Sequence, residues 1–361
     1  MPLYVDLHYI HSDYFTKEDA FKAHMKDLNV QDQFGVTHKK YWINFDQKTM
    51  FCLVDGPNKE ACNAAHQTAH LDQSCNIIEV SDDEFISFLG LGHKNDQDMA
   101  LTLSGEIDSG YRTLFLLRMT NFTQNDSGQK THICNFIKEY NGSLIFQPDN
   151  QIMASFIFAS DAISCAAVIN ARLRSTQDNL DYTMVLVTGR PVDDHGTELF
   201  EEPKARAQNL CDIGLSNIVY VDAMTKTLLR KESQKKESDL KAFHTINDND
   251  FVFSKALFSA VNGRLNCSEF KLGHLCKSLG LSKAQVYRKT KALTGMSPNE
   301  LIREMRLRKS LEILKQNEKT IAEIAYELGF NSPTYFTRVF KKRYKSLPTE
   351  FTKVLNSSYL Q

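Results

Sequence analysis

The sequence predicts a multidomain protein in which two α+β domains precede an all-α domain. Residues 1–90 and 110–231 each combine short apolar strands with amphipathic helices. Residues 250–355 carry helix signals, and they contain one short pattern twice, about 50 residues apart. A chain of 361 residues is long enough for two to four domains, and its 42% hydrophobic content is sufficient for ordinary globular cores.

The first domain, residues 1–90, is expected to have the order strand, helix, strand, strand, helix, strand. The strands are expected at Leu3–Tyr9, Thr37–Phe45, Thr49–Asp55 and Ile77–Val80, and the helices at Thr16–Asn29 and from Pro57 to Leu71. This βαββαβ order is the ferredoxin-like pattern.

Five segments of this domain resemble a family of small bacterial ferredoxin-like proteins, some of which are described as nickel-binding. The segments are L-Y-V-D-L-H, D-L-N-V-Q-D-Q-F-G-V, Y-W-I-N-F-D, F-C-L-V-D-G-P and A-A-H-Q-T-A-H. The related proteins usually have a glycine where this chain has Leu71-Asp72. The resemblance implies a sensor domain that binds a transition metal such as nickel.

The histidines of this domain are the candidate metal ligands. His66 and His70 stand four residues apart, a spacing that places two imidazoles on one face of a helix. His8, His24 and Cys52 are expected to complete an N/S site suited to nickel, zinc or copper. Histidines four residues apart also occur on plain helix surfaces, so an apolar ligand pocket and a purely structural interface remain the alternatives.

The second domain, residues 110–231, is also expected to be a ferredoxin-like α+β domain. A polar linker over Gly90–Gly110 precedes it, and a charged helical or flexible connector over Lys231–Asp250 follows it. The expected strands are Leu114–Met119, Ser143–Gln147, Ile152–Phe158, Met184–Thr188 and Ile218–Val221, with helices that end at Tyr140 and span Ala162–Arg174 and Pro203–Cys211.

This second domain resembles class III nucleotide cyclases in L-F-L-L-R-M-T-N-F-T, P-D-N-Q-I-M-A-S-F, V-T-G-R and A-R-A-Q-N-L. Such enzymes hold two metal ions with two carboxylates. The matching positions here are Arg118 and Asn150, and Glu202 replaces a transition-state asparagine. A cation cannot ligate a cation, so we expect no enzyme but a degenerate cyclase-like domain for dimerisation or signal relay. A nucleotide- or metal-binding protein with residual cyclase-like activity is the alternative.

The repeated pattern of the last domain reads L-C-K-S-L-G-L-S-K-A-Q-V-Y-R from Leu275 and I-A-Y-E-L-G-F-N-S-P-T-Y-F-T-R from Ile324. In each copy a glycine is placed to end a helix with positive φ, and a serine two residues later caps the next helix. Each copy therefore predicts a helix-turn-helix unit. Between them, the capping box that begins at Ser297-Pro298 opens a long helix that reaches Leu314, and Thr320 opens a further capping box.

Two such units joined by one helix resemble the DNA-binding domain of AraC/XylS-family transcription regulators. Two recognition helices on one spacer suit successive major grooves, roughly 34 Å apart. Arg288 and Arg338 match positions that contact bases in that family, although the alternative is that they are ordinary solvated arginines. The expected DNA-binding residues are Lys283, Ala284, Tyr287, Arg288, Ser332, Thr334, Thr337 and Arg338, with Lys341 and Lys342 on the phosphates.

Charge divides the chain in the way that this resemblance requires. Residues 251–361 hold 20 Lys and Arg against 8 Asp and Glu, a net charge of +12, whereas residues 1–250 have a net charge of −13. A basic domain is suited to phosphate contacts. The expected partners are double-stranded promoter DNA, RNA polymerase, through the family resemblance, and a second copy of the chain. The absence of a long apolar stretch and of C-x-x-C pairs favours a cytoplasmic protein that does not bind membranes.

Overall fold

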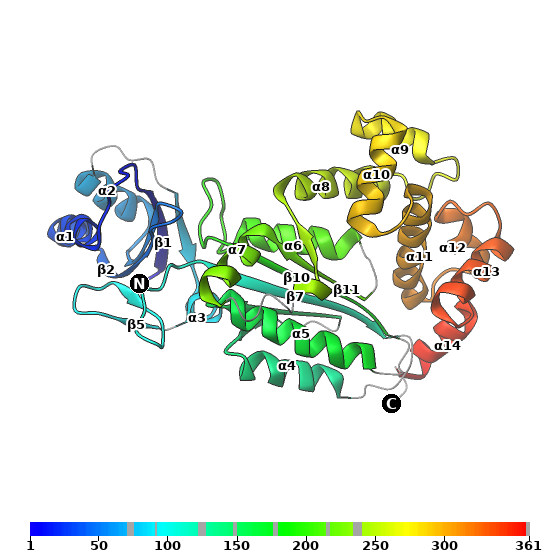
Figure 1. The fold of residues 1–361 in the computed structure, drawn as a ribbon, viewed down its shortest axis with the longest axis horizontal. Helices are drawn as coiled ribbons and strands as arrows, with labels where there is room; N and C mark the ends of the chain where they lie inside the picture. Colours follow the sequence, from blue (N-terminus) through cyan, green and yellow to red (C-terminus); the bar gives the residue numbers. More distant parts are fainter. Residues whose placement is uncertain are drawn as a thin grey trace.

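The computed structural model describes residues 1–70, 76–90, 92–121, 128–146, 150–175, 180–213, 217–233 and 240–358. Along the long axis, a small sheet with two helices, a larger sheet with helices on both faces, and a group of helices follow one another in chain order (Figure 1). None of the helices in the described ranges has the length and apolar composition that a membrane crossing requires.

The N-terminal part is a four-stranded antiparallel sheet with the order β2-β3-β1-β4. Its elements follow the predicted order: β1 (Leu3–Tyr9), α1 (Lys17–Phe34), β2 (Thr37–Asn44), β3 (Thr49–Asp55), α2 (Lys59–His70) and β4 (Ile77–Val80). Thr16 and Asp19 form a capping box that starts α1, and Gly35 ends it at φ 64°. The expected helix extension to Leu71 and the departure at Leu71-Asp72 lie outside the described residues.

The helix that precedes the polar linker of Gly90–Gly110 was not predicted, and part of that linker is folded. Asp82–Leu89 form the helix α3, and His93–Lys94 (β5) pairs with Ala100–Leu101 (β6) in a small hairpin. Met99 bridges to Tyr41 at the edge of the four-stranded sheet, and Asp108 forms a buried ion pair with Arg112. Residues 82–110 are packed because their few apolar side chains, such as Phe85, Phe88 and Met99, are buried against the sheets. The polar composition of these residues gives no sign of this packing.

The central part is a six-stranded sheet with the order β12-β11-β10-β7-β9-β8. Strand β10 pairs antiparallel with β7 and parallel with β11, and β12 extends the sheet beside β11. The elements are β7 (Arg112–Asn121), α4 (Gln129–Glu139), β8 (Ser143–Phe146), β9 (Gln151–Phe156), α5 (Ala159–Ser175), β10 (Leu180–Gly189), α6 (Glu201–Ile213), β11 (Ile218–Asp222), α7 (Ala223–Glu232) and β12 (His244–Ile246).

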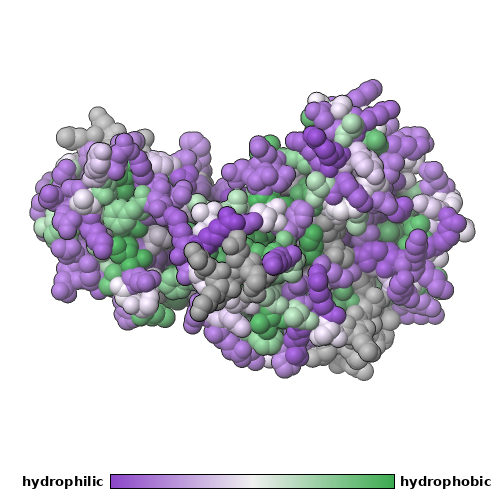
Figure 2. Space-filling view, in the orientation of Figure 1, coloured by the Kyte–Doolittle hydropathy of each residue, from purple (hydrophilic) through white to green (hydrophobic). Residues whose placement is uncertain are grey.

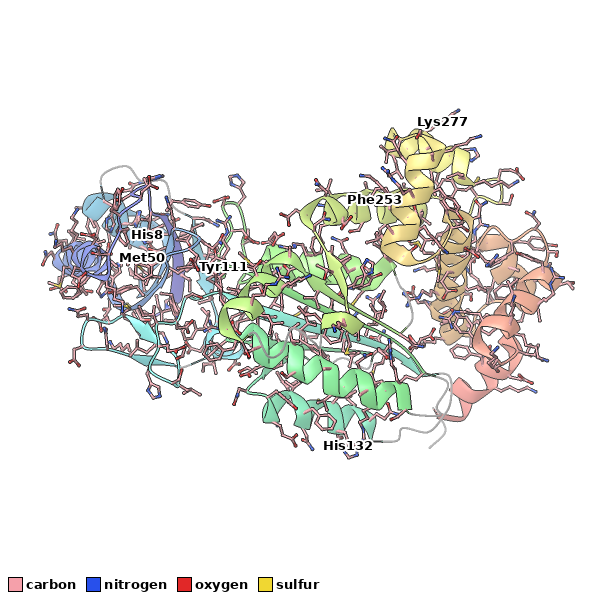
Figure 3. All side chains as sticks on the ribbon, viewed as in Figure 1. His8, Met50, Tyr111, His132, Phe253 and Lys277 are labelled. Atoms are coloured by element: carbon pink, nitrogen blue, oxygen red, sulfur yellow. The ribbon has the colours of Figure 1, made fainter. Side chains whose placement is uncertain are left out.

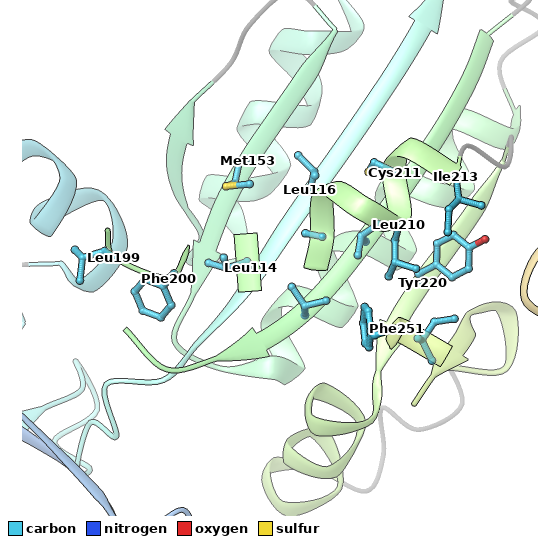
Figure 4. Packing of buried hydrophobic residues seen from close by; sticks show 14 of the residues in the cluster. Leu114, Leu116, Met153, Leu199, Phe200, Leu210, Cys211, Ile213, Tyr220 and Phe251 are labelled. Atoms are coloured by element: carbon cyan, nitrogen blue, oxygen red, sulfur yellow. The ribbon is translucent and has the colours of Figure 1, made fainter. Parts of the chain in front are cut away.

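Each face of this sheet has its own apolar core. On one face α4 and α5 pack over Phe115, Leu117 and Ile152. On the other face α6 packs over Leu114 and Leu116, and the same cluster continues through Tyr220 to Phe251 at the start of α8 (Figure 4). The predicted connector of residues 231–250 is therefore corrected in part, because β12 belongs to the sheet and Ile246 is fully buried.

The C-terminal part consists of helices joined by turns and loops in its described residues. Its helices are α8 (Asp248–Asn262), α9 (Leu272–Leu279), α10 (Lys283–Thr294), α11 (Pro298–Gln316), α12 (Ile321–Glu327), α13 (Pro333–Tyr344) and α14 (Pro348–Ser358). The pairs α9–α10 and α12–α13 lie at the two ends of α11 (Figure 1). In the space-filling view this part is mostly hydrophilic at the surface (Figure 2).

Candidate nucleic-acid interface and histidine cluster

The first helix-turn-helix unit consists of α9 and α10. Gly280 ends α9 in the left-handed region at φ 63°. Ser282 then caps α10: its Oγ accepts from the backbone N–H of Gln285 at 3.3 Å, and the Gln285 side chain accepts from the backbone N–H of Ser282 at 3.0 Å. This reciprocal pair confirms the predicted capping box.

The second unit consists of α12 and α13 and repeats the same turn. Gly329 follows α12 at φ 72°, and the N–H of Phe330 bonds to the carbonyl of Ala325 at 2.9 Å. Ser332 Oγ accepts from the N–H of Tyr335 at 3.2 Å, and Pro333 is in the first turn of α13. Helices α10 and α13 thus begin with the capping residues that the sequence predicts.

The predicted DNA-contacting side chains lie on the accessible faces of α10 and α13. On α10, Val286 is buried and its four predicted neighbours are exposed; on α13, Phe336 and Phe340 are buried and the predicted residues lie on the other side. The guanidinium of Arg338 stacks over the Tyr335 ring at 5.3 Å. The exposed residues are Lys283, Ala284, Tyr287, Arg288, Thr334, Arg338, Lys341 and Lys342, whereas Ser332 and Thr337 are partly buried.

Helix α11 joins the two units rigidly. Arg306, near its middle, is almost buried, and its guanidinium donates to the carbonyls of Leu265 at 3.0 Å and Cys267 at 2.6 Å. A Cβ on Gly329 would lie 2.8 Å from the Leu265 carbonyl oxygen, so the turn of the second unit packs tightly on the segment before α9. Sequence patterns do not reveal this role of Arg306, because its partners are backbone atoms about 40 residues away.

Arg343, which directly follows Lys341 and Lys342, is bound by carboxylates of the protein instead of pointing to solvent. Its Nε donates to Glu304 of α11 at 2.7 Å, and its Nη1 donates to Asp181 of β10 at 3.2 Å. The two carboxylates hold the pKa of Arg343 above its ordinary value, although burial alone would lower it. Lys341, Lys342 and Lys345 remain exposed.

In the N-terminal part, the structure brings together three of the five predicted metal ligands. The ring centroid of His8 lies 4.5 Å from that of His66 and 5.4 Å from that of His70, and the two α2 histidines are 5.1 Å apart. One ligand atom from each lies within 4.8 Å of the others. His8 comes from β1 and lies between the sheet and the helices α1 and α2 (Figure 3).

Two buried carboxylates, which the sequence reasoning missed, bind this cluster. Asp6 Oδ1 lies 2.9 Å from His8 Nε2, and Asp27 Oδ1 lies 2.7 Å from His70 Nε2. Burial opposes charge on both partners of the first pair, yet their mutual attraction lowers the pKa of Asp6 and raises that of His8. The alternation of β1, which places Asp6 and His8 on the same face, is the signal that identifies Asp6.

The other two predicted ligands are placed differently. Cys52 is next to the cluster, because its Sγ lies 3.5 Å from His8 Nε2. His24 is not: its Nε2 lies 3.3 Å from Asp98, and its ring is 6.3 Å from His38 and 4.9 Å from Tyr41. His24 and Asp27 both stand on α1, but only Asp27 contacts a histidine of the cluster, whereas His24 is bound by Asp98.

The hydrogen bonding of His66 tests whether a metal ion fits this cluster. Both ring nitrogens of His66 are buried, and neither has a hydrogen-bond partner. Burial, assisted by the nearby charge of His8, lowers the pKa of His66 to about 4, so its ring is neutral at neutral pH. A neutral imidazole is the form that binds metals, and a bound ion would satisfy one of these nitrogens. The donor set therefore fits a transition-metal ion.

Of the three residues that match cyclase positions, Arg118 and Asn150 lie at neighbouring strands, whereas Glu202 lies apart from them. Arg118 Nη2 pairs with Asp212 at 2.7 Å near the end of α6, whereas Glu202 is at the start of the same helix and pairs with Arg206. Ten residues of helix separate Glu202 from Asp212, a distance of roughly 15 Å along the axis. Asn150 contributes a backbone carbonyl that accepts from the N–H of Met119 at 2.9 Å.

Comparisons with known proteins found matching families for the N-terminal and the C-terminal part of the chain. Residues 275–353 match the family described as "Helix-turn-helix domain", and residues 4–80 match "Nickel responsive protein SCO4226-like". A histidine kinase P4 of Formosa agariphila is 33% identical over 107 residues, which are 30% of this chain and 8% of that protein.

Two named transcription regulators are also similar. MtrA of Neisseria gonorrhoeae is 31% identical over 85 residues, which are 24% of this chain and 28% of that protein. The activator RhaR of Mannheimia succiniciproducens is 27% identical over 150 residues, which are 42% of this chain and 50% of that protein. The chain thus spans half or less of the length of each of these three relatives. Residues 275–353 thus form a helix-turn-helix domain, and the chain is similar to DNA-binding transcription regulators.

Proposed function

We propose that this protein is a sequence-specific transcription regulator of the AraC type, more specifically an activator, that binds double-stranded promoter DNA. The observation that carries the proposal is the pair of exposed recognition helices, α10 and α13, at the two ends of the single helix α11. This arrangement supports contact of Arg288 and Arg338 with successive major grooves, where an arginine that binds guanine O6 and N7 discriminates by roughly 1–3 kcal/mol.

The electrostatics support the same proposal. The net charge of +12 in residues 251–361 favours contact with phosphates, and the net charge of −13 in residues 1–250 keeps the rest of the chain off DNA. Lys341 and Lys342 are exposed next to the recognition face of α13, a position that suits them to contact the phosphates of the DNA backbone. Ser332 and Thr337, being partly buried, are better placed to fix the helix than to reach a base.

For the upstream regions we propose a ferredoxin-like sensor domain over residues 1–90, a second ferredoxin-like, degenerate cyclase-like domain over residues 110–231, and the DNA-binding domain over residues 250–355. The sheet orders β2-β3-β1-β4 and β10-β7-β9-β8 support a common ferredoxin-like arrangement. The ion pair of Arg118 with Asp212 supports a role of the second domain in signal relay or homodimer formation rather than in catalysis. We further propose contact with RNA polymerase and a cytoplasmic location.

The sensor domain is proposed to hold one transition-metal ion, such as nickel, through His8, His66 and His70. The unpartnered ring nitrogens of His66 and the match of residues 4–80 to a nickel-responsive family support this assignment. A bound ion supplies a positive charge that links β1 to α2. Asp6 and Asp27 orient the rings of His8 and His70 through hydrogen bonds, as carboxylates beside metal-binding histidines commonly do.

A chain of contacts connects this cluster to the central sheet. Tyr9, next to His8 on β1, bonds through its hydroxyl to Asp194 and accepts from Arg190 at 2.5 Å. Asn76 donates to the carbonyls of Asp193 at 2.6 Å and Gly196 at 2.8 Å. The loop that carries these residues leads directly into α6. These contacts support the proposal that a change at His8 reaches α6, the helix on which α8 packs.

The test uses the full chain and a duplex that it selects from a random library. Arg288→Ala and Arg338→Ala are each expected to weaken binding to the selected duplex by about 5- to 150-fold, while binding to unrelated DNA changes little. Arg264→Ala is the control, because Arg264 is an exposed arginine of the same part outside α10 and α13. Undiminished specific binding by both recognition-helix variants would overturn the proposal.

A further inference from the structure

Two hollows adjoin the spacer helix α11, and Arg303 lines both of them. The first, of about 250 Å³, lies between α11, the segment before α9 and the turn of the second helix-turn-helix unit. The second, of about 520 Å³, lies between α11 and α13. Other polar side chains in their lining are Lys271, Asn299 and Asn331 in the first hollow, and Arg338 and Lys342 in the second.

Arg303 is a half-buried arginine, and no hydrogen bond or ion pair joins its guanidinium to any residue that the structure describes. Glu300, about one turn earlier on α11, is the carboxylate that its charge affects. This carboxylate is exposed and already engaged, because it accepts from the N–H of Ser297 at 2.8 Å and from the Ser297 hydroxyl at 2.7 Å. A guanidinium has five N–H donors, so Arg303 retains its capacity to bind an anion.

The carboxylates beside the second hollow are balanced by other cations. Glu304 lines this hollow, and Arg343 donates to it at 2.7 Å and to Asp181 at 3.2 Å. Arg308, about one turn further along α11, is attracted by the same two carboxylates. Two positive charges thus face two negative ones, and Arg303 is not needed to balance them.

The remaining cations of the lining differ in how far the protein uses them. Arg306 donates to two backbone carbonyls of the segment before α9. Lys271 comes within 3.7 Å of Glu269, but both side chains are well exposed, so this pair contributes little. The lining residues that remain to attract an anion are Arg303, Arg338 and Lys342.

Arg303 opens on the same side of the molecule as the recognition face of α13. Arg338 belongs to that face and Lys342 is next to it, and both are exposed and line the second hollow together with Arg303. Two major-groove segments on one side of a duplex are separated by a minor groove roughly 6 Å wide. The 19 residues of α11 span about 28 Å between the two units, so a duplex that both units bind would place this minor groove over the spacer helix.

We propose, on the basis of the proposed DNA binding, that Arg303 enters the minor groove between the two major-groove segments and makes binding sensitive to the width of that groove. Narrow minor grooves, such as those of A·T tracts, have an enhanced negative potential that attracts an inserted arginine. A guanidinium is more weakly hydrated than an ammonium group, so it loses its water more readily on entering such a groove. The spacer helix thus adds a third contact, which selects the central base pairs by their shape.

The test uses the full chain and two forms of the duplex that it selects. Both forms keep the two outer segments, and the base pairs between them are an A·T tract in one form and a G·C-rich run in the other. Filter binding at one salt concentration is expected to show about tenfold tighter binding of the A·T form by the wild type, and a ratio of about twofold or less for Arg303→Ala. Lys309→Ala is the matched control and should keep the wild-type ratio, because Lys309 is an exposed cation of α11 that lines neither hollow.

The outcomes separate this inference from the proposed function. If Arg288→Ala and Arg338→Ala lose specific binding while Arg303→Ala keeps the wild-type ratio, the minor-groove contact is wrong and the proposed function stands. An equal loss on both duplexes by Arg303→Ala, with unchanged thermal unfolding, indicates a phosphate contact only and also overturns the inference. A wild type that binds no duplex specifically overturns both.

A second variant covers a loss of stability in Arg303→Ala. Arg303→Lys keeps the positive charge and the long aliphatic stem, so it should fold even if the alanine variant unfolds more readily. Because an ammonium group is more strongly hydrated, this variant is expected to lose most of the preference for the A·T form while still binding both duplexes. Full retention of the wild-type ratio by Arg303→Lys would contradict readout by the guanidinium.

Discussion

Arg343 of α13 binds Asp181 of β10, so the second recognition helix is fastened to the six-stranded sheet. The same guanidinium donates to Glu304 of α11 at 2.7 Å. One arginine therefore sets the position of α13 relative to both the spacer helix and the central part. The orientation of the second helix-turn-helix unit therefore depends on Asp181, which precedes Arg343 by 162 residues in the chain.

Replacing Arg343 with Met is expected to destabilise the protein by roughly 2 kcal/mol, because it leaves two partly buried carboxylates without this shared cation. The side chains of Asp181 and Glu304 are only 12% and 9% exposed, so water compensates them poorly. Urea unfolding at neutral pH measures the change. Lys342→Met, the exposed neighbour, should leave the midpoint unchanged; equal midpoints for both variants would rule out the anchoring role.

Two glycines with similar backbone angles should respond differently to alanine. Gly280 and Gly329 have φ values of 63° and 72°, but only at Gly329 does an added Cβ collide with other atoms, the Leu265 carbonyl at 2.8 Å and Arg306 at 2.9 Å. Gly280→Ala should cost about 1 kcal/mol from the left-handed conformation alone. Gly329→Ala should cost roughly 3 kcal/mol or more, because the two units must separate slightly. Comparable losses in thermal unfolding would contradict this difference.

Phosphate contacts and base contacts should be separable by salt. Lys341→Ala is expected to weaken binding to all DNA and to reduce the slope of log K against log salt by roughly 0.9 for the lost contact. Arg288→Ala should instead relax the sequence preference and change that slope less. Filter binding at several salt concentrations, with the selected and an unrelated duplex, distinguishes them. Equal losses on both duplexes for both variants would argue against the assignment.

Local signals explain why much of the fold could be predicted. The turns at Gly280 and Gly329 and the caps at Ser282, Ser297 and Thr320 are each specified by residues within one helical turn, and the structure has all of them. The strands β1 and β3 were also predictable with their bounds, because alternation or apolar runs mark them.

Features that depend on distant partners could not be predicted in this way. Helix α3 is short and was not predicted, because its apolar residues find their packing partners on distant strands. The position of His24 beside Asp98 and not beside His8 depends on how α1 crosses the sheet. Asp27 gives no local sign that it binds His70, which is 43 residues away. Such contacts depend on how distant elements pack together, and the periodic pattern of apolar residues does not reveal them.

Lys40, a buried lysine of β2, should make the stability of the protein depend on alkaline pH. The pKa of Lys40 falls from its ordinary 10.5 to about 8, so between these values the unfolded chain binds a proton that the folded protein has released. The free energy of unfolding should therefore rise with pH across this window. Lys40→Met should remove this rise, because methionine has no proton to release. Lys39→Met is the control, and an unchanged pH profile in Lys40→Met would refute the argument.

Native mass spectrometry of the tag-free full chain after nickel exposure tests the metal site. One ion per chain is expected, and His66→Ala with His70→Ala should remove it, because two of its three proposed imidazole ligands are lost. His24→Gln is the matched control: His24 is buried in the same part but bonds to Asp98, so this variant should keep the metal. At an ion concentration about 100 times Kd, the metal should stabilise the wild type by roughly 2.7 kcal/mol. Metal loss in the His24 variant alone would move the site to His24, His38 and Asp98, whereas bare wild-type protein would eliminate metal sensing and leave the DNA-binding assignment intact.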